Sequence, residues 1–405
     1  MNLKFIRWVD IYLGIPLAYL VFWARRMFRR RLHIAEENRV QRILLIKFWG
    51  VGNIIMLLPS ARALTERFPG AEIDILTLAN NREPAESSGL FDAVHIISNN
   101  SLSGFLVTAW KSYHRLKKAG YDLIIDFEQF ARFSALFSAL IGQKKTIGFE
   151  TKGQRRGFLY THPVNYNNGI HITQSFYSLA EQAGCAKRER IEAQAVTAGK
   201  KHQEETLRLI AEWGFQNQRL ILMHAGTSRN FSLRRWPPEY YANLADRLID
   251  NFSVKIVFTG TSEERELAEK TMLCMKNRPS AVNASGKLDF HRFIALIKLS
   301  DLLVSADTAP VHLASCLSVP VVGLYGPNTP LLYGPWGAKS IYFYKNLSCS
   351  PCITNYNAKI NRCRHPQGVG MCMKSITPEE VFRGIKTAYF DKNARFRPAK
   401  VKSDE

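Results

Sequence analysis

RILLIKFWGVGNIIMLLPSARALTERF, residues 42–68, is the stretch that decides the fold. The apolar run over 42–48 predicts a buried strand, WGVGN predicts a turn, and the spacing after it is that of a helix. Working outward, further strands are expected at 72–79, 93–98 and 121–128, and a helix over 110–120. Short apolar strands that alternate with helices indicate a parallel sheet covered on both faces.

A second series of the same kind begins near residue 219. It contains the expected strands 219–226, 254–260, 301–306 and 319–326, and the expected helices 238–252, 262–275 and 290–300. The stretch between the series, residues 185–215, is charged and helical in pattern. We therefore predict an α/β protein with two Rossmann-like domains, 42–190 and 215–385, that face a cleft where ligands bind.

The composition limits the partners of this chain. Its 405 residues include 55 Lys and Arg against 34 Asp and Glu, a formal net charge of +21. Such an excess favours nucleic acid, anionic lipid or phosphorylated substrates. A hydrophobic share of 46% excludes a disordered chain. Seven cysteines, an odd number, do not make a secreted disulfide scaffold and favour a reducing compartment.

The N-terminal segment, residues 1–41, combines an apolar run with basic residues. Residues 11–24 are 14 consecutive uncharged residues, fewer than the roughly 20 of a spanning helix. Residues 1–42 hold nine basic and three acidic residues. Aromatic side chains of the kind found at membrane interfaces accompany the run: Trp8, Tyr12, Tyr19 and Trp23. We predict a membrane-associated segment on the cytoplasmic face, with a buried helix or a cleaved signal peptide as alternatives.

The turn at 49–53, called the first turn below, can be compared with the glycine-rich motifs that bind nucleotides. Gly50 and Gly52 supply two glycines of G-x-G-x-x-G, but the third is missing, which disfavours a dinucleotide site. The chain also lacks G-x-x-x-x-G-K-[ST]. Two glycines still allow the backbone to approach a substrate closely, so we predict a binding loop here. No aromatic and basic nucleic-acid module is present, so nucleic acid is not an expected partner.

Four segments, in this order, resemble glycosyltransferase family 9, the lipopolysaccharide heptosyltransferases. They are residues 46–64, the segment HAGTSRNFSLRRWPPEYYANLADRL (224–248), FTGTSEERELA (258–268) and SADTAPVHLASCLSVPVVGLYGPNTP (305–330). The resemblance implies a GT-B fold, with the acceptor on the N-terminal domain and the nucleotide-sugar donor on the C-terminal one. It also implies inverting transfer with no cofactor and a metal-independent donor site.

The predicted donor site centres on Asp307, Thr308 and Ala309. This turn joins a strand to a helix, where main-chain N–H groups and the positive helix end suit a diphosphate; a simple N-cap is the alternative. The resemblance implies that Asp307 contacts the donor sugar, and it places Ala309 where the family usually has Gly. It also implies that Arg234, in place of the usual Lys, binds the donor phosphates and that Glu264 binds the ribose. The other predicted donor residues are Thr227, Ser228 and His312, the last with a packed helix histidine as an equal alternative.

The main departure from the family is Asn53, where heptosyltransferases usually have the Asp that acts as general base. An amide has no useful basicity near neutral pH. Three interpretations stay open. In the first, another carboxylate replaces it, with Glu128 the first candidate and Asp126 the second. In the second, Asn53 only orients the acceptor in a related transferase whose base lies elsewhere. In the third, the protein binds its ligands without transfer.

Four cysteines cluster near the C-terminus, in the loop 349–372. Their spacing resembles that of a metal site in the first pair only, Cys349-x2-Cys352; Cys363 and Cys372 are further apart. A structural Zn²⁺, reduced thiols and disulfides are all open, with reduced thiols the leading interpretation.

Together these features predict an inverting glycosyltransferase at the cytoplasmic face of the bacterial inner membrane. It would move a heptose or related sugar from a nucleotide-diphosphate sugar, with ADP-heptose the expected donor, to a lipopolysaccharide core or other lipid-linked saccharide. A membrane-tethered sugar-nucleotide or glycolipid binding protein without turnover is the main alternative, and an epimerase on the same fold is a weaker one.

Overall fold

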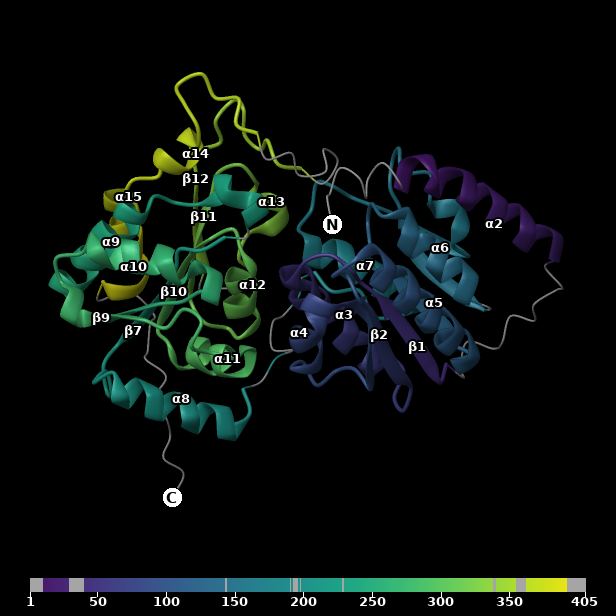
Figure 1. The fold of residues 1–405 in the computed structure, drawn as a ribbon, viewed down its shortest axis with the longest axis horizontal. Coiled ribbons are helices and arrows are strands. Elements are labelled where there is room, and N and C mark those ends of the chain that lie inside the picture. The colour runs from purple at the N-terminus through teal and green to yellow at the C-terminus, as the bar shows by residue number, and fades with distance from the viewer. Residues whose placement is uncertain are drawn as a thin grey trace. The chain divides into compact units, whose positions relative to one another are not determined.

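The computed structural model describes residues 10–28, 40–142, 144–189, 191, 196, 198–227, 229–337, 340–354 and 362–391. The chain divides into two compact units, Met1–Ala195 and Val196–Glu405. Each is built round one six-stranded sheet of parallel strands, with helices packed on it (Figure 1). Two Rossmann-like domains are therefore confirmed.

The first unit has the sheet order β3-β2-β1-β4-β5-β6. Its strands are β1 (Arg42–Ile46), β2 (Glu72–Leu78), β3 (Ala93–Ile97), β4 (Leu123–Asp126), β5 (Lys145–Glu150) and β6 (His162–Asn165). Its helices are α2 (Gly14–Phe28), α3 (Val51–Arg67), α4 (Arg82–Glu86), α5 (Leu102–Ala119), α6 (Arg132–Ile141) and α7 (Ile172–Ala183), with short 3₁₀ turns η1 (Ala79–Asn81) and η2 (Gly157–Leu159).

The second unit has the sheet order β12-β11-β10-β7-β8-β9. Its strands are β7 (Leu220–His224), β8 (Lys255–Phe258), β9 (Ala281–Asn283), β10 (Leu302–Ala306), β11 (Val321–Tyr325) and β12 (Ser340–Tyr344). Its helices are α8 (Lys200–Glu212), α9 (Pro238–Phe252), α10 (Arg265–Leu273), α11 (Phe290–Leu299), α12 (Ala309–Cys316), α13 (Pro330–Tyr333), α14 (Met371–Lys374) and α15 (Pro378–Ile385). Short helical turns complete it: η3 (Arg229–Arg234), η4 (Ser262–Glu264), η5 (Arg278–Ser280) and η6 (Lys386–Phe390).

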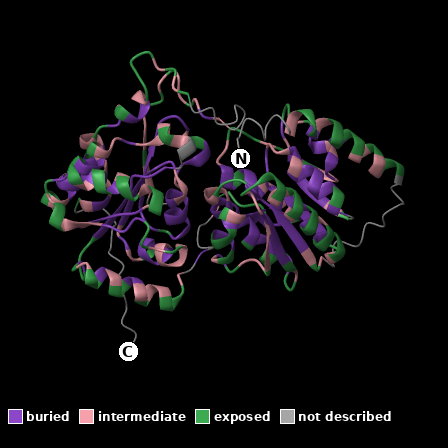
Figure 2. Cartoon of the chain, in the orientation of Figure 1, coloured by how far each residue is buried: buried purple, intermediate pink, exposed green. Residues whose placement is uncertain are grey.

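The central strands of both sheets are buried on both faces (Figure 2). This explains their continuous apolar runs, since a parallel sheet with helices on each side leaves neither face to water. Strand order reverses between β1 and β4 in the first unit and between β7 and β10 in the second. Ligands of such sheets bind beyond the carboxyl ends of the strands at this reversal, so the candidate residues of each unit are those that follow its two strands at the reversal.

Helix α2 lies along α6 on the first unit. Asp10, just before α2, accepts hydrogen bonds from the Arg132 and Phe133 N–H groups at the start of α6, and its carboxylate pairs with the Arg132 guanidinium at 2.9 Å. At the far end, Arg25 donates to the Gly142 carbonyl that follows α6. An acid at the helix start and a base at its end both suit the dipole of α6.

Between these two contacts, small and apolar side chains of α2 fill the interface with α6. Ala18 is fully buried against Ala135 and Ala139, and Phe22 packs on Phe158. Within the described residues, no helix has the length and apolar character that crossing a bilayer requires. Residues 1–9 and 29–39 of the predicted membrane-associated segment lie outside the described residues.

Candidate functional site

Glu128, which follows β4, holds the first turn in place through hydrogen bonds. Glu128 Oε1 accepts hydrogen bonds from the main-chain N–H groups of Phe48 (2.7 Å) and Trp49 (2.9 Å). Lys47 Nζ lies 3.1 Å from the same oxygen and also donates to Gln129 Oε1. Lys47 and Glu128 are both buried, and burial lowers the pKa of Lys47 although Glu128 opposes this. Glu128 therefore joins the ends of β1 and β4 through a buried charge pair.

Asp126, the second candidate base, is enclosed at the end of β4. Its Oδ2 lies 2.7 Å from the Arg156 guanidinium and accepts a hydrogen bond from the Tyr160 hydroxyl (2.6 Å). Its Oδ1 accepts the Glu128 N–H. Burial raises the pKa of the Asp126 carboxyl, and Arg156 acts in the opposite direction. Asp126 thus holds the main chain at Glu128 in place. A proton-transfer role for either residue stays a prediction.

Gly50 and Asn53 shape the start of α3. Gly50 has φ +90°, a conformation that L side chains rarely adopt, so glycine is required at this turn. Asn53 Nδ2 donates to the Trp49 carbonyl at 2.8 Å, which turns its amide back onto the first turn. Gly52 lies in the opening turn of α3. The residues predicted for the acceptor loop are therefore brought together at the carboxyl end of β1.

In the second unit, Asp307 follows β10 and forms a compact polar cluster. Arg234 lies 3.1 Å from Asp307 Oδ2 and donates to the Asp307 carbonyl at the same distance. Asn328, after β11, donates to Oδ2 at 2.7 Å. The Arg234 guanidinium also lies 4.4 Å from the centre of the Phe231 ring. The predicted pair Arg234 and Asp307 is thus brought together, and Asn328 joins it.

Thr308 and Ala309 form the N-terminus of α12 beside this cluster. Thr308 is extended and its side chain does not cap the helix; its hydroxyl instead lies 2.9 Å from Ser305 Oγ. Thr308 thus occupies the N-cap position, as the alternative interpretation expected, but without a side-chain cap. Pro310 has no N–H and the Val311 N–H donates to the Thr308 carbonyl, so Ala309 supplies the main-chain N–H at this terminus. His312 is buried in α12 and its ring stacks on Trp336, with centroids 5.5 Å apart. This contact fits the alternative of a packed helix histidine.

Glu264 lies where β7 and β8 end. Its carboxylate accepts the Thr261 N–H at 2.9 Å, and Oε2 lies 3.9 Å from His224 Nε2. A Cβ on Gly226 would come within 2.2 Å of the Glu264 carboxyl carbon, so the glycine gives the carboxylate its place. Burial lowers the pKa of His224.

Thr227, the residue after Gly226, is already engaged in hydrogen bonds. Its hydroxyl accepts a hydrogen bond from Arg235 Nε at 3.1 Å, and its side chain is buried. Ser228, predicted beside it, lies outside the described residues. Sequence reasoning missed three polar residues of this region, and all stand inside the quoted motifs: His224, Arg235 and Asn328.

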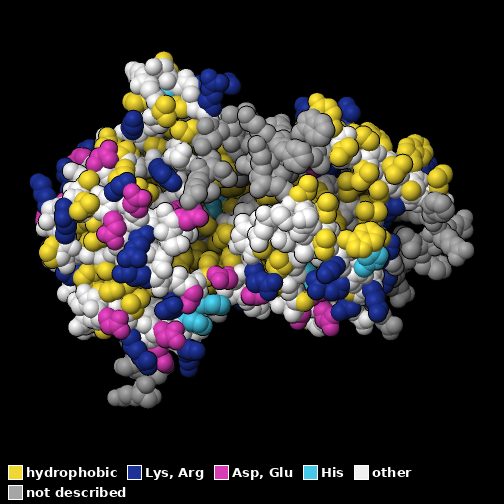
Figure 3. Space-filling view, in the orientation of Figure 1, with side chains coloured by type: hydrophobic (Ala, Val, Ile, Leu, Met, Phe, Trp, Pro, Cys, Tyr) yellow, Lys and Arg dark blue, Asp and Glu magenta, His cyan; other side chains and the backbone are white. Residues whose placement is uncertain are grey.

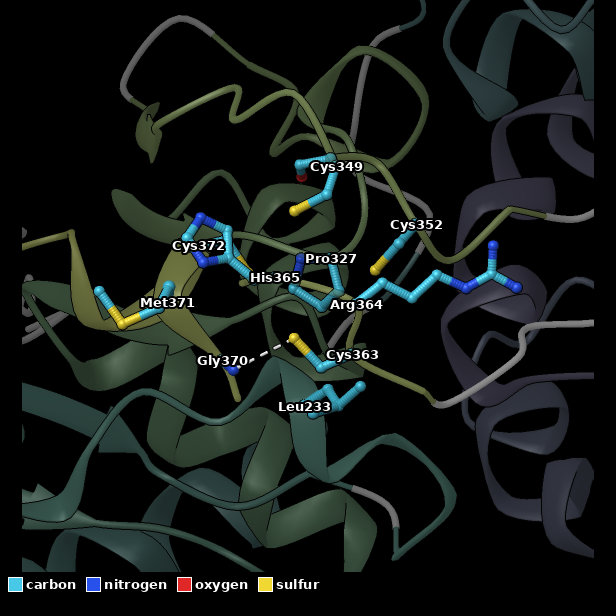
Figure 4. Close-up of a pocket in the computed structure, with 11 residues that line it drawn as sticks. Leu233, Pro327, Cys349, Cys352, Cys363, Arg364, His365, Gly370, Met371 and Cys372 are labelled. Carbon is cyan, nitrogen blue, oxygen red and sulfur yellow. Dashed lines mark hydrogen bonds between the residues drawn. The ribbon is translucent and has the colours of Figure 1, made fainter. Parts of the chain in front are cut away.

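The four predicted cysteines line one small cavity of about 10 Å³ together with His365 (Figure 4). Cys363 Sγ accepts a hydrogen bond from the Gly370 N–H at 3.5 Å. Burial raises the pKa of Cys372 to about 11 and also raises the pKa of Cys352. No three Cys, His, Asp or Glu side chains of the described residues stand in a metal-binding arrangement. The described part of the loop therefore gathers thiols, which suit Zn²⁺ chemically, without arranging them as a metal site.

Comparison with known proteins gives consistent matches. The sequence profile of glycosyltransferase family 9 (heptosyltransferase) matches residues 109–361. Lipopolysaccharide heptosyltransferase 1 of Pseudomonas aeruginosa is 24% identical over 367 residues, covering 84% of this chain and 96% of that protein. Lipopolysaccharide core heptosyltransferase OpsX of Haemophilus influenzae is 26% identical over 239 residues, covering 56% of this chain and 65% of that protein.

Solved structures share the fold. A family 9 glycosyltransferase from Veillonella parvula superposes with a TM-score of 0.71 at 20% identity, covering 87% of this chain and 98% of that one. E. coli heptosyltransferase WaaC with ADP-2-deoxy-2-fluoro heptose gives a TM-score of 0.64 at 16% identity, covering 86% and 99%.

Proposed function

Because the chain belongs to glycosyltransferase family 9 (heptosyltransferase) and is therefore a glycosyltransferase, we propose that it transfers heptose in lipopolysaccharide biosynthesis. The donor we propose is ADP-heptose, and the acceptor is a lipopolysaccharide core or other lipid-linked saccharide. The names of the relatives support the sugar and the pathway, and the ADP-heptose analogue of the E. coli structure supports the donor. We propose that transfer inverts the anomeric centre, as the family resemblance implies.

The observation that carries this proposal is the cluster of Arg234, Asp307 and the start of α12. The Arg234 guanidinium and the Ala309 N–H at the positive end of α12, both close to the end of β10, suit the diphosphate of a nucleotide sugar. As the bond to the sugar breaks, negative charge grows on the leaving diphosphate. Hydrogen-bond donors that are already in place stabilise this charge more in the transition state than in the ground state.

Asp307 has two tasks in this arrangement. Its carboxylate and its carbonyl both accept from Arg234, which fixes the guanidinium beside the helix terminus. The Asn328 amide holds the same carboxylate from the other side. We propose that this fixed carboxylate also receives the hydroxyls of the donor sugar, as the family resemblance implies.

The acceptor would meet the first turn of the other unit. We propose that Asn53 orients the acceptor hydroxyl. Glu128 stays a candidate base, but its Oε1 is already engaged by the Phe48 and Trp49 N–H groups and by Lys47. These contacts favour the interpretation in which Glu128 holds the turn.

We further propose that the enzyme works on the cytoplasmic face of the bacterial inner membrane. The basic N-terminal segment and the exposed apolar side of α2 support this location. A second candidate function is a binding protein without turnover, and Asn53 in place of the usual Asp is the observation that favours it.

One experiment separates these two functions. The purified protein is incubated with ADP-heptose and a truncated lipopolysaccharide core, and ADP release is measured alongside donor binding by calorimetry. Arg234→Ala should weaken donor binding by at least about tenfold, because it removes a charged phosphate contact. Arg292→Ala, on the exposed side of α11 in the same unit, is the matched control and should change nothing. Donor binding without ADP release across several donors and acceptors would identify a binding protein instead.

A further inference from the structure

Helix α5 leaves a group of large apolar side chains uncovered. Leu102, Leu106, Val107 and Trp110 are each at least half exposed, up to 65% for Trp110. They occupy the first half of the helix, whereas Ala109, Ser112 and Leu116 face the core. An isolated exposed leucine needs no explanation, but four such side chains on two turns form a surface of their own.

Helix α2 leaves a second apolar group uncovered. Leu13, which precedes the helix, and Leu17, Leu20, Trp23 and Met27 on it are exposed, with Met27 at 74%. They lie opposite the side that carries Ala18, Val21, Phe22 and Arg25 onto α6 and η2, as their helical spacing requires. The outward side of α2 therefore has no covering element among the described residues.

The two groups belong to one face of the first unit. Helix α6 contacts α2 on one side and α5 on the other. All three helices follow one another across the unit in Figure 1, and hydrophobic side chains are gathered over α2 and over α5 on the face shown in Figure 3. We name this surface, made of the outward sides of α2 and α5, the two-helix face.

The charge of the two-helix face has one sign. Residues 11–28 and 102–119 contain no Asp or Glu. Exposed bases border the apolar groups: Arg26 on α2 and Lys111, Arg115, Lys117 and Lys118 on α5. Arg26 also lines a cavity of about 90 Å³ with Arg25 and Phe158, beside the apolar side of α2. Outer helices of the second unit such as α8 and α10 mix acids with bases instead.

We propose that the two-helix face docks on an anionic bilayer, with α5 as well as α2 in contact with lipid. Apolar side chains that include two tryptophans, bordered by bases and free of acids, suit the boundary between headgroups and acyl chains. A protein partner of ordinary composition would leave these bases without complementary charge. Two contacts on different helices fix the orientation of the acceptor-binding unit on the membrane, which one helix acting as a tether does not.

This inference rests on the proposed membrane location, not on the sugar that is transferred. The test uses the full chain and co-sedimentation with vesicles of phosphatidylethanolamine and phosphatidylglycerol, compared with vesicles of phosphatidylcholine. The variant Leu106→Gln/Trp110→Gln changes α5, and Leu17→Gln/Leu20→Gln changes α2. Leu273→Gln, an equally exposed leucine of the second unit, is the control.

We expect each double variant to lower the partition coefficient on anionic vesicles by at least about tenfold, since each removes two side chains from the lipid. The control should bind as the unchanged protein does, and added salt should weaken binding. Circular dichroism and donor binding should be unaltered, which shows that the variants fold.

Normal binding by the α5 variant together with lost binding by the α2 variant would overturn the two-helix face and leave α2 as a tether. No binding by the unchanged protein would overturn the membrane location itself, while ADP release measured on a soluble acceptor would still test the transferase. A dimer without lipid that dissociates in both variants would show that the face joins two copies, which also overturns the proposal.

Discussion

Replacing Glu128 by Gln asks whether this carboxylate holds the first turn or takes a proton. Gln keeps an oxygen for the Phe48 and Trp49 N–H groups, but it leaves the Lys47 cation, only 1% exposed, without its directly paired carboxylate. Removing one partner of a buried ion pair costs about 3–5 kcal/mol. Because the main-chain hydrogen bonds are retained, we expect Glu128→Gln to lower the free energy of unfolding by about 3 kcal/mol, the lower end of that range.

The double variant Lys47→Met/Glu128→Gln isolates the charge. Met fills the space of the lysine stem without a cation. We therefore expect the Lys47→Met change to restore about 1–3 kcal/mol of the lost free energy of unfolding. ADP release should be restored with it. Urea unfolding followed by circular dichroism gives the free energies. Glu72→Gln is the matched control in the same unit: its ion pair with Arg42 is 2.7 Å long but exposed, and should contribute at most about 1 kcal/mol.

An unchanged unfolding free energy in Glu128→Gln would refute the structural reasoning. If this variant instead stays stable, binds the donor and loses turnover by about a hundredfold or more, Glu128 is the general base. In that case the additional Lys47→Met change will not restore turnover.

Three further predictions concern the second unit. Burial lowers the pKa of His224. As pH falls, His224 therefore gains a proton in the unfolded chain near the ordinary histidine pKa of about 6.5, but not yet in the folded chain. The free energy of unfolding should then decrease below about pH 6.5, by up to about 1.4 kcal/mol per pH unit. This loss should be absent in His224→Gln but present in His114→Gln, as urea unfolding at about pH 7.5 and about pH 5.5 would reveal. Gly226→Ala should displace the Glu264 carboxylate, because its Cβ would lie 2.2 Å away, and weaken ADP binding by at least about tenfold in calorimetry; unchanged affinity would exclude Glu264 from the donor site. If the Cys349–Cys372 loop holds Zn²⁺, the purified protein should contain about one equivalent of zinc by elemental analysis. Rebinding of zinc should release protons, because burial raises the pKa of Cys372 to about 11 and its thiol is protonated before it binds. No metal together with four titratable thiols in the loop would support reduced cysteines.

The sequence allowed the fold class and the central strands to be predicted, because strands buried on both faces carry unbroken apolar runs. It did not reveal the internal strand β5 or the edge strands β6, β9 and β12. HPVN contains a proline and AVN has only three residues, and an edge strand needs neither length nor continuous apolarity. Helix α6 was also missed, although its residues are strongly apolar.

The candidate site was predicted unevenly for a similar reason. Arg234 and Asp307 stand in spaced motifs, and the structure brings them together. The partners of Glu128 were out of reach, because a lysine such as Lys47 is ordinarily exposed and its burial depends on a carboxylate 81 positions away. Patterns of single residues do not encode such a pairing.

The fastening of α2 along α6 has a consequence for anyone who shortens the chain. Removing the N-terminal residues through 28 would take away the Asp10 carboxylate from the start of α6 and bare the surface formed by Ala135, Leu136 and Ala139. The trimmed protein would expose an apolar surface and tend to aggregate, even though the removed segment looks dispensable. Polar replacements on the outward side of α2 are the better route to a well-behaved sample, because they leave the inward packing in place.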